Sequence, residues 1–342
     1  MTEGQIMEDQ EIVKVEGLHK IYETGKGLFN QQKRLVKAVD NVSFSIKSGE
    51  TLGLVGESGC GKTTVGRCLL RGVEPSGGKV FFRHPGGISD LASLPPGEMR
   101  ALRRYFQMIF QDPFSSLNAR WTVFNIIGEP LVSIMKMKAS ERKDLVADIM
   151  VKVGLRPEYM TRYPHSFSGG ERQRIGLARA LITKPLFVIA DEPVSALDVS
   201  VRAQTLNLMH ELQTTLNLTY LFISHDLSVI EYLCDRVIVM YVGNIVEAGS
   251  PEDMYKRPLH PYTEALLSAI PSRHPDKKRN RIVLSGDIAD PANLPPGCPL
   301  HPRCKYARQL CRETKPELED NGSGRYVRCH CYKDLTLTGE YA

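Results

Sequence analysis

Short apolar runs separated by polar turns form the main pattern of the chain. Residues 12–18 and 38–46 alternate apolar and polar side chains, which is typical of β-strands with one buried face. Uninterrupted apolar runs of strand length occupy residues 51–55, 106–110, 186–190 and 219–223. Helical spacing appears at residues 64–71 and again at residues 139–153, where we expect a mainly helical insertion. Strands that alternate with helices predict an α/β fold.

Glycine and proline mark the connections between these elements. Tyr22 lies in a turn-rich segment that ends near Gly27, and residues 84–97 are expected to form a surface excursion. Two apolar runs around a glycine turn predict a β-hairpin at residues 237–242 and 245–248.

The segment after the strand at residues 51–55 carries the strongest chemical signal. It reads Gly56, Glu57, Ser58, Gly59, Cys60, Gly61, Lys62 and Thr63, and Thr64 follows at the start of the helix. Glycines let the backbone fold closely around phosphate, so that N–H groups and the positive helix N-terminus face the anion. Lys62 would neutralise the β- and γ-phosphates, and the Thr63 hydroxyl would hold Mg²⁺. The alternative is a glycine turn that only joins a strand to a helix, and the Lys-Thr pair in register argues against it.

Polar side chains close two other apolar runs. Asp191 and Glu192 follow the run at residues 186–190. Asp191 would bind Mg²⁺, and Glu192 would orient and polarise the attacking water. Two carboxylates at a strand end are common on protein surfaces, but they seldom follow a long apolar run. Gln111 closes the run at residues 106–110, where its amide can join the Mg²⁺ shell and report on the γ-phosphate.

Three further places could contact a nucleotide. Ser168, Gly169 and Gly170 begin a helix and form a second anion site, too far along the chain to belong to the glycine loop. His225 follows the run at residues 219–223 and could reach a γ-phosphate, although a lone histidine is usually a surface residue. The Tyr22 ring could stack on adenine, and an ordinary packing role is an equal alternative.

Composition narrows the class of protein. With 342 residues the chain can form one large domain and a smaller one, and a formal charge of +5 is too weak to indicate nucleic-acid binding. No apolar run is long enough to cross a membrane, and the acidic N-terminus does not resemble a secretion signal. We therefore expect a protein of the reducing cytoplasm.

Five of the eight cysteines lie close together near the end of the sequence, at positions 298, 304, 311, 329 and 331. Without a secretion signal, such a cluster indicates metal binding rather than disulfides. A tetrahedral metal centre with four thiolate ligands could stabilise a segment that is rich in loops. The spacing does not match a zinc ribbon, and free thiols are the alternative.

The order of the motifs resembles that of an ABC-transporter nucleotide-binding domain. The matching segments are the Walker A loop at 56–63, the Q-loop at Gln111, the signature at 167–171, the Walker B strand at 186–191, the D-loop at 195–198 and the switch histidine at His225. The match is closer still to the dipeptide/oligopeptide importer ATPase subunits, through residues 107–118, 259–263 and 295–298. The resemblance covers about residues 12–332, with Glu171 in place of a frequent Gln and Ala119 in place of a common Pro.

This resemblance implies a P-loop ABC ATPase domain with a RecA-like core, an antiparallel β subdomain and a helical signature subdomain. The domain would span residues 1–255, with the helical subdomain at about residues 113–182. A small Cys-rich extension would span residues 256–342.

The resemblance also implies ATP hydrolysis coupled to transmembrane transport. It assigns catalysis to Lys62, Glu192 and His225, and it adds Asp198 to the nucleotide contacts. Two subunits would pair head to tail, so that residues 168–170 contact the γ-phosphate of an ATP held by the P-loop of the partner. The pair would be a heterodimer of related ATPases in preference to a homodimer. It would work at the cytoplasmic face of the membrane with two permease subunits and, indirectly, an external solute-binding protein.

In such ATPases, cysteines similar to Cys298, Cys304, Cys311 and Cys329 are associated with a [4Fe–4S] cluster. Zinc is the alternative metal, and Cys331 is expected to be a bystander.

Two rival classes stay open. A soluble ABC ATPase acting on nucleic acid or ribosomes usually carries two ATPase units or a long coiled coil, and this chain shows neither. An iron–sulfur assembly ATPase would not need the segment at residues 260–262. Among importers, nickel complexes and oligosaccharides are alternatives to peptides.

Overall fold

A computed structural model describes residues 11–24, 34–112, 116–270 and 281–339 of the chain. The described chain forms two compact units that interleave in sequence. The described residues of the first unit are 11–14, 45–51, 81–112 and 116–223, and those of the second are 15–24, 34–44, 52–80, 224–270 and 281–339. The P-loop, which is the glycine loop at residues 56–63, and the cysteine-rich segment at residues 298–331 therefore belong to the same unit.

The core of the first unit is a parallel sheet in the order β8-β7-β6. Its strands are β6 (Phe106–Ile109), β7 (Phe187–Asp191) and β8 (Thr219–Ser224), and the sequence predicted all of them. Every residue of β7 and β8 is buried, which explains their uninterrupted apolar character. The parallel pair β7 and β8 is connected through helix α7 (Val199–Leu216).

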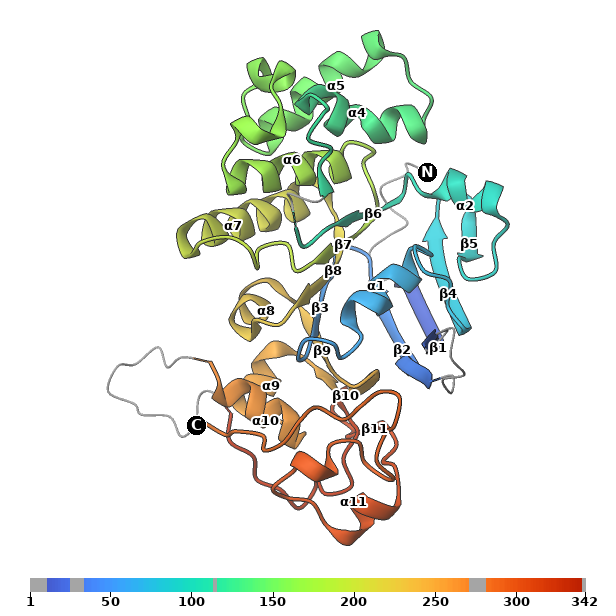
Figure 1. Cartoon of the computed structure of the whole chain (residues 1–342), viewed down its shortest axis with the longest axis vertical. Coiled ribbons are helices and arrows are strands. Elements are labelled where there is room, and N and C mark those ends of the chain that lie inside the picture. Colours follow the sequence, from blue (N-terminus) through green and yellow to red (C-terminus); the bar gives the residue numbers. More distant parts are fainter. Residues whose placement is uncertain (1–10, 25–33, 113–115, 271–280, 340–342) are drawn as a thin grey trace, which may run out of the picture. The chain divides into compact units, whose positions relative to one another are not determined.

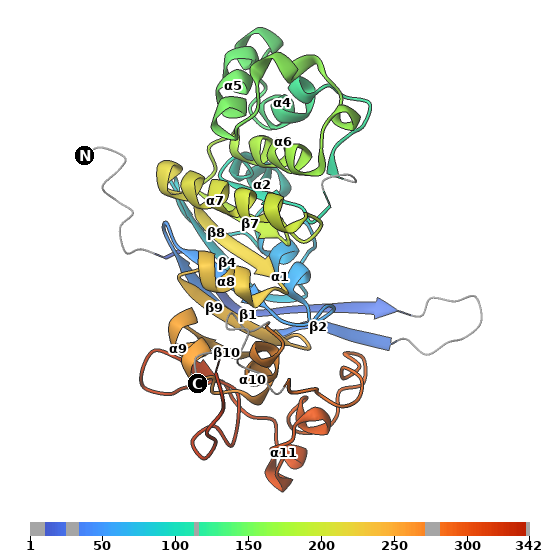
Figure 2. The ribbon, with the colours of Figure 1, turned by 90° about the vertical axis from the view of Figure 1, so that its left-hand side faces the viewer.

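The helical part of the first unit follows β6 in sequence. Helices α4 (Val123–Ser133), α5 (Ala139–Lys152) and α6 (Gly169–Leu181) pack on one another, as Figures 1 and 2 show from two directions. Two short 3₁₀ turns, Pro157–Thr161 and Pro164–Ser166, lead into α6. The predicted helix at residues 139–153 is confirmed, and the insertion is mainly helical as expected.

Residues 84–97 lie mostly at the surface, as expected, but they contain regular elements. Strand β4 (Gly77–His84) turns tightly into strand β5 (Gly87–Asp90), and helix α2 (Pro96–Leu102) begins at the proline pair. Gly87 has a φ of 118°, which suits the hairpin turn. Turn residues in the sequence therefore marked a hairpin and a helix start instead of a loop.

The second unit contains the P-loop strand and the predicted hairpin. Strand β3 (Thr51–Val55) lies parallel to β9 (Arg236–Tyr241), which follows the short helix α8 (Leu227–Leu233). Strand β10 (Asn244–Gly249) pairs with β9 in the antiparallel sense, as the hairpin prediction required. Two short strands, β12 (Tyr326–Val327) and β11 (Glu319–Asp320), extend this sheet beyond β10.

Long antiparallel strands precede the P-loop in sequence. Strands β1 (Glu11–Thr24) and β2 (Arg34–Lys47) join β4 and β5 in a four-stranded sheet with the order β2-β1-β4-β5. Tyr22 lies within β1, so the expectation of a turn-rich segment there is wrong. Beyond residue 18 the alternation of apolar and polar residues is too weak to predict that the strand continues to Thr24.

The C-terminal segment of the second unit is built from short elements joined by loops (Figure 1). Helices α9 (Pro251–Lys256), α10 (Pro261–Ser268) and α11 (Gln309–Glu313) accompany the 3₁₀ turn η3 (His301–Arg303). Glu247 of β10 anchors them: its buried carboxylate accepts hydrogen bonds from the backbone N–H groups of Leu259 and His260 at 2.9 and 3.0 Å. It also forms an ion pair with Arg325 at 2.8 Å.

Candidate nucleotide site and cysteine cluster

The P-loop connects β3 to helix α1 (Lys62–Leu69) through a tight glycine turn. A Cβ atom on Gly56 or Gly61 would lie 2.2 Å from a backbone carbonyl oxygen, and both residues have positive φ angles of 151° and 106°. Gly59 also has a positive φ, of 82°, but a Cβ there would meet nothing within 4 Å. Two glycines thus make the backbone packing possible, and the third leaves the mouth of the loop open for a ligand.

Lys62 is buried at the start of α1, with its ammonium turned toward the loop. Its Nζ donates to the carbonyl oxygens of Gly56 at 2.7 Å and Glu57 at 3.0 Å. The N-cap Gly61 supplies no side-chain hydrogen bond to the helix, and Thr63 and Thr64 are the next residues of the first turn. The loop therefore combines a held cation with a helix N-terminus that has no side-chain cap, which suits an anionic ligand.

Cys60 of the loop is a buried thiol. Its backbone carbonyl accepts a hydrogen bond from the N–H of Gly243 at 2.8 Å, which ties the loop to the β9-β10 turn. Burial raises the pKa of Cys60, although the nearby Lys62 opposes this effect. The side chain is therefore a packing group in its protonated form.

Two residues of the C-terminal segment hold the P-loop, and sequence reasoning missed both. The Tyr262 hydroxyl accepts a hydrogen bond from the Glu57 N–H at 2.8 Å. Arg303 forms an ion pair with the Glu57 carboxylate at 2.9 Å. Arg303 lies 246 positions from Glu57, and no local pattern in the sequence pairs the two.

Within the first unit, Gln111 and Glu192 lie together at the ends of their strands. The Gln111 amide donates to the Glu192 carboxylate, Nε2 to Oε2, at 2.9 Å. Glu192 has a φ of 47°, and its N–H donates to the Ile223 carbonyl at 2.9 Å. A positive φ angle strains the backbone of any residue other than glycine. Strain of this kind is common at functional sites. Asp191, the last residue of β7, is buried beside it.

The second anion site is a capped helix start. Ser168 caps α6: its Oγ accepts from the Glu171 N–H at 3.3 Å and donates to the Glu171 carboxylate at 2.8 Å. The N–H of Ser168 bonds the same carboxylate, and these bonds lower the pKa of Glu171. Gly169 is half-buried, and a Cβ on Gly170 would lie 2.4 Å from the Val201 side chain. Gly170 is thus needed for the packing of α6 on α7, whereas a Cβ on Gly169 would come no closer than 3.9 Å to Leu197.

Asp198 caps the neighbouring helix α7. Its carboxylate accepts from the Val201 N–H at 3.0 Å and from the Ser200 hydroxyl at 2.9 Å. The hydrogen bond from Val201 is the main reason why the pKa of Asp198 is lowered. Asp198 is exposed, so its carboxylate stays ionised and accessible on this surface.

The remaining predicted nucleotide contacts lie in the second unit with the P-loop. Tyr22 is about one-third exposed on β1, and the Lys20 Nζ lies 4.9 Å from the centroid of its ring. His225 is exposed directly after β8. The structure thus gathers Gln111, Asp191, Glu192, the residues at 168–170 and Asp198 in one unit, and Tyr22, the P-loop and His225 in the other.

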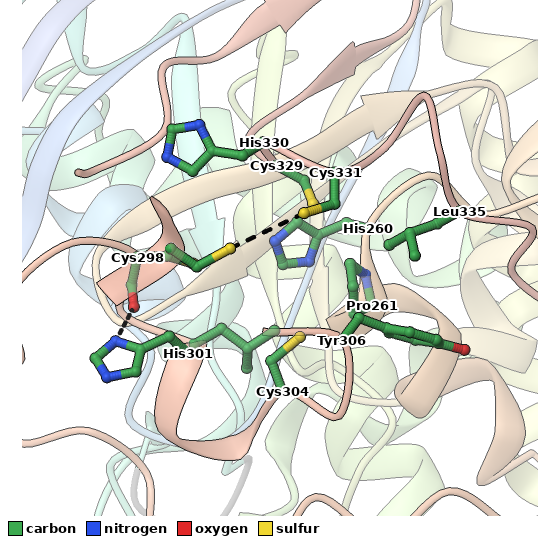
Figure 3. Close-up of a pocket in the computed structure, with 12 residues that line it drawn as sticks. His260, Pro261, Cys298, His301, Cys304, Tyr306, Cys329, His330, Cys331 and Leu335 are labelled. Atoms are coloured by element: carbon green, nitrogen blue, oxygen red, sulfur yellow. Dashed lines mark hydrogen bonds between the residues drawn. The ribbon is translucent and has the colours of Figure 1, made fainter. Parts of the chain in front are cut away.

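The C-terminal cysteines gather around one small cavity, shown in Figure 3. Its lining includes Cys298, Cys304, Cys311, Cys329 and Cys331, together with His260, His301 and His330. Cys331 was expected to be a bystander, but its Sγ lies 4.0 Å from that of Cys311 and it lines the same cavity. The cysteine cluster, defined by these five residues, is therefore one structural feature.

The donors of the cysteine cluster suit a thiophilic metal centre. Several soft sulfur atoms and no carboxylate line the cavity, which favours iron–sulfur or zinc chemistry over hard cations. The cavity measures about 20 Å³, room for about one water molecule. In the described part of the chain no three His, Cys, Asp or Glu side chains are spaced to hold a metal ion. A bound centre would thus require the side chains of the cluster to rearrange.

Burial keeps three thiols of this cluster protonated. It raises the pKa of Cys298 to about 11 and that of Cys329 to about 12, and it also raises the pKa of Cys304. Binding of a metal would therefore release protons.

Comparison with known proteins places the chain in a large group of relatives. A family model for ABC transporters matches residues 39–195, and a model for the oligopeptide/dipeptide transporter C-terminal region matches residues 246–311. The oligopeptide transport ATP-binding protein AppF of Bacillus subtilis is 49% identical over 94% of this chain and 97% of its own length. The dipeptide transport ATP-binding protein DppF of Haemophilus influenzae is 48% identical over 95% and 98% of the two chains, and that of Escherichia coli is 48% identical over 94% of each.

Solved structures agree with this assignment. The ATP-binding cassette MJ0796, in a dimer bound to ADP and Pi, matches with a TM-score of 0.61 and 25% identity over 70% of this chain and 98% of its own. CbiO1 from Clostridium perfringens, part of an ABC transporter complex, matches with a TM-score of 0.61 and 26% identity over 72% and 91% of the two chains. Among the residues that the structure describes, no helix is long and apolar enough to span a membrane. The two family models and the near-full-length relatives agree, and the chain is a member of the ABC transporter ATP-binding proteins that carry the oligopeptide/dipeptide transporter C-terminal region.

Proposed function

We propose that this chain is the ATPase subunit that powers peptide uptake through membrane-spanning partner subunits. ABC ATP-binding subunits hydrolyse ATP to drive transport, and the P-loop geometry suits the binding of phosphate. The observation that carries the proposal is near-full-length identity of 48 to 49% to proteins named for oligopeptide and dipeptide transport. The subunit works as a peripheral protein at the cytoplasmic face of the membrane.

The proposed chemistry assigns a role to each side chain. Lys62 neutralises charge on the β- and γ-phosphates while the loop carbonyls hold its ammonium. Glu192, oriented by Gln111, accepts a proton from the water that attacks the γ-phosphate. His225 donates to the γ-phosphate, and Tyr22 stacks on adenine. Thr63, Asp191 and Gln111 would hold Mg²⁺, which would supply positive charge to offset that of the phosphates.

A second subunit completes the site in this proposal. Ser168, Gly169 and Gly170 contact the γ-phosphate of an ATP bound to the P-loop of the partner, and Asp198 lies at the same subunit interface. The Ser168 hydroxyl donates to Glu171 at 2.8 Å, so a phosphate must replace that acceptor. A related but different ATPase chain is the favoured partner, and a second copy of this chain is the alternative. An external solute-binding protein delivers the peptide to the permease subunits.

A transport assay tests the proposed function. Cells that lack this chain should take up a radiolabelled oligopeptide only when the wild-type gene is returned, and Lys62→Met should fail to restore uptake. Labelled nickel and a labelled oligosaccharide, offered in parallel, test the other substrate classes. Uptake of either one instead of the peptide would replace the substrate assignment.

We further propose that the cysteine cluster binds a [4Fe–4S] centre through Cys298, Cys304, Cys311 and Cys329, with zinc as the alternative. The sulfur-rich lining supports this assignment. Cys331 is a fifth thiol at the same cavity and leaves one cysteine more than such a centre needs.

Anaerobic purification should yield about four irons and about four sulfides per chain, with a broad absorption near roughly 400 nm. Cys304→Ser should remove most of the iron, whereas Cys68→Ser, a buried thiol on α1 outside the cluster, should retain it. Cys331→Ser should also retain it. Zinc without iron would assign a structural zinc site, and a chain free of metal would refute the proposal.

A further inference from the structure

We propose that Arg303 and Tyr262, from the C-terminal segment, are positioning residues of the ATP site. They hold Glu57 in the P-loop and thereby set the direction of the Lys62 ammonium. The inference rests on ATP binding by this chain and adds two residues that lie outside the nucleotide-binding motifs.

Glu57 is held at three separate atoms or groups. Its N–H donates to the Tyr262 hydroxyl at 2.8 Å, and its carbonyl accepts from the Lys62 Nζ at 3.0 Å. Its carboxylate accepts from Arg303 at both oxygens, at 2.9 and 3.3 Å. Because one residue takes part in all these bonds, a shift of Glu57 changes the position of the carbonyl that orients Lys62.

The Arg303 pair is more than a surface ion pair. The Arg303 side chain is only 8% exposed and that of Glu57 28%, and the two parallel bonds fix the planes of both groups. The guanidinium also lies 6.0 Å from the centroid of the Tyr241 ring. Its hydrogen bond with Glu57 raises the pKa of Arg303, so the cation is permanent.

Tyr262 is similarly fixed. Its ring is fully buried, with a centroid 4.8 Å from that of Tyr241. The residue lies in the first turn of helix α10 (Pro261–Ser268), and its own N–H donates to the His260 ring at 3.2 Å. The hydroxyl therefore reaches the P-loop from a rigid support.

Arg303 also neutralises the negative charge of Glu57. A carboxylate in a loop that binds triphosphate repels the ligand, and a guanidinium in a bidentate pair neutralises it. Removal of Arg303 should therefore both loosen the loop and expose an anion beside the phosphates. Glu57→Gln separates these effects because it removes the charge and retains the size of the side chain.

The test is equilibrium binding of MgATP to the purified full-length chain. Arg303→Met should weaken the affinity about tenfold, and Arg303→Lys should recover part of the loss. In the Glu57→Gln background, Arg303→Met should cost clearly less than in the wild type, because the anion is gone. Tyr262→Phe should weaken binding about threefold, since it leaves the Glu57 N–H without its acceptor.

Arg308→Met is the matched control. Arg308 forms an ion pair with Asp334 in the same C-terminal segment at 2.6 Å, and its removal should leave the affinity for MgATP unchanged. Misfolding would reduce the number of binding sites, whereas the proposal predicts a weaker affinity at each site. An unchanged affinity in Arg303→Met, or an equal loss in Arg308→Met, would overturn the inference. Failure of the wild type to bind MgATP would instead contradict the proposed function.

Discussion

ATP hydrolysis should fall by about 10²- to 10⁴-fold in Glu192→Gln, while the affinity for MgATP stays within about twofold of the wild type. The amide cannot accept the proton of the attacking water, and it retains the size of the carboxylate. The Gln111 amide, which donates to Glu192 at 2.9 Å, can still donate to the amide oxygen, so the local geometry is preserved. Phosphate release by the assembled transporter measures the rate, and binding to the purified chain measures the affinity.

Two variants make this result specific. Glu211→Gln changes an exposed carboxylate on α7 of the same unit and should hydrolyse ATP like the wild type. Glu192→Gln should also trap ATP-bound subunit pairs, and Ser168→Arg in the same chain should prevent the trapping. A rate in Glu192→Gln above about one tenth of the wild type would exclude Glu192 as the general base.

The free energy of unfolding should fall by about 3 to 5 kcal/mol in Glu247→Ala. The Glu247 side chain is 0% exposed and pairs with Arg325, which is 9% exposed. Truncation leaves the Arg325 charge buried and unpaired, and it removes the acceptor for the N–H groups of Leu259 and His260. Urea denaturation followed by circular dichroism measures the change.

An exposed pair provides the comparison for this prediction. Glu252 and Lys256 form an i,i+4 ion pair on α9 with side chains 75% and 58% exposed. Glu252→Ala should cost less than about 1 kcal/mol because solvent screens such pairs. If Glu247→Ala were equally mild, Glu247 would not anchor the C-terminal segment to β10.

The sequence predicted those parts of the site that depend on local pattern. Gly56 and Gly61 are required because a Cβ at either position would overlap a carbonyl oxygen. The spacing of these glycines in the sequence reveals this requirement directly. The buried runs of β7 and β8 were equally clear, since strands covered on both faces are mainly apolar along their length.

Features that depend on distant contacts could not be predicted in this way. Arg303 meets Glu57 across 246 positions, and each looks like an ordinary surface charge in its own neighbourhood. Cys331 was set aside on spacing alone, yet the fold brings it to the cavity through β12 and the turn after it. The hairpin from β4 to β5 was hidden because its tight glycine turn looks like a loop.

The Arg303 and Tyr262 contacts also bear on how such a chain can evolve. The P-loop at residues 56–63 and the segment after residue 255 lie in one compact unit. The sequence motifs, in contrast, place a domain boundary between them, after residue 255. A chimaera that joined these first 255 residues to the tail of another ATPase would leave the Glu57 carboxylate without its guanidinium, unless the new tail supplied one. We therefore expect recombination at that boundary to weaken the ATP site, and we expect positions 57 and 303 to change together in descent.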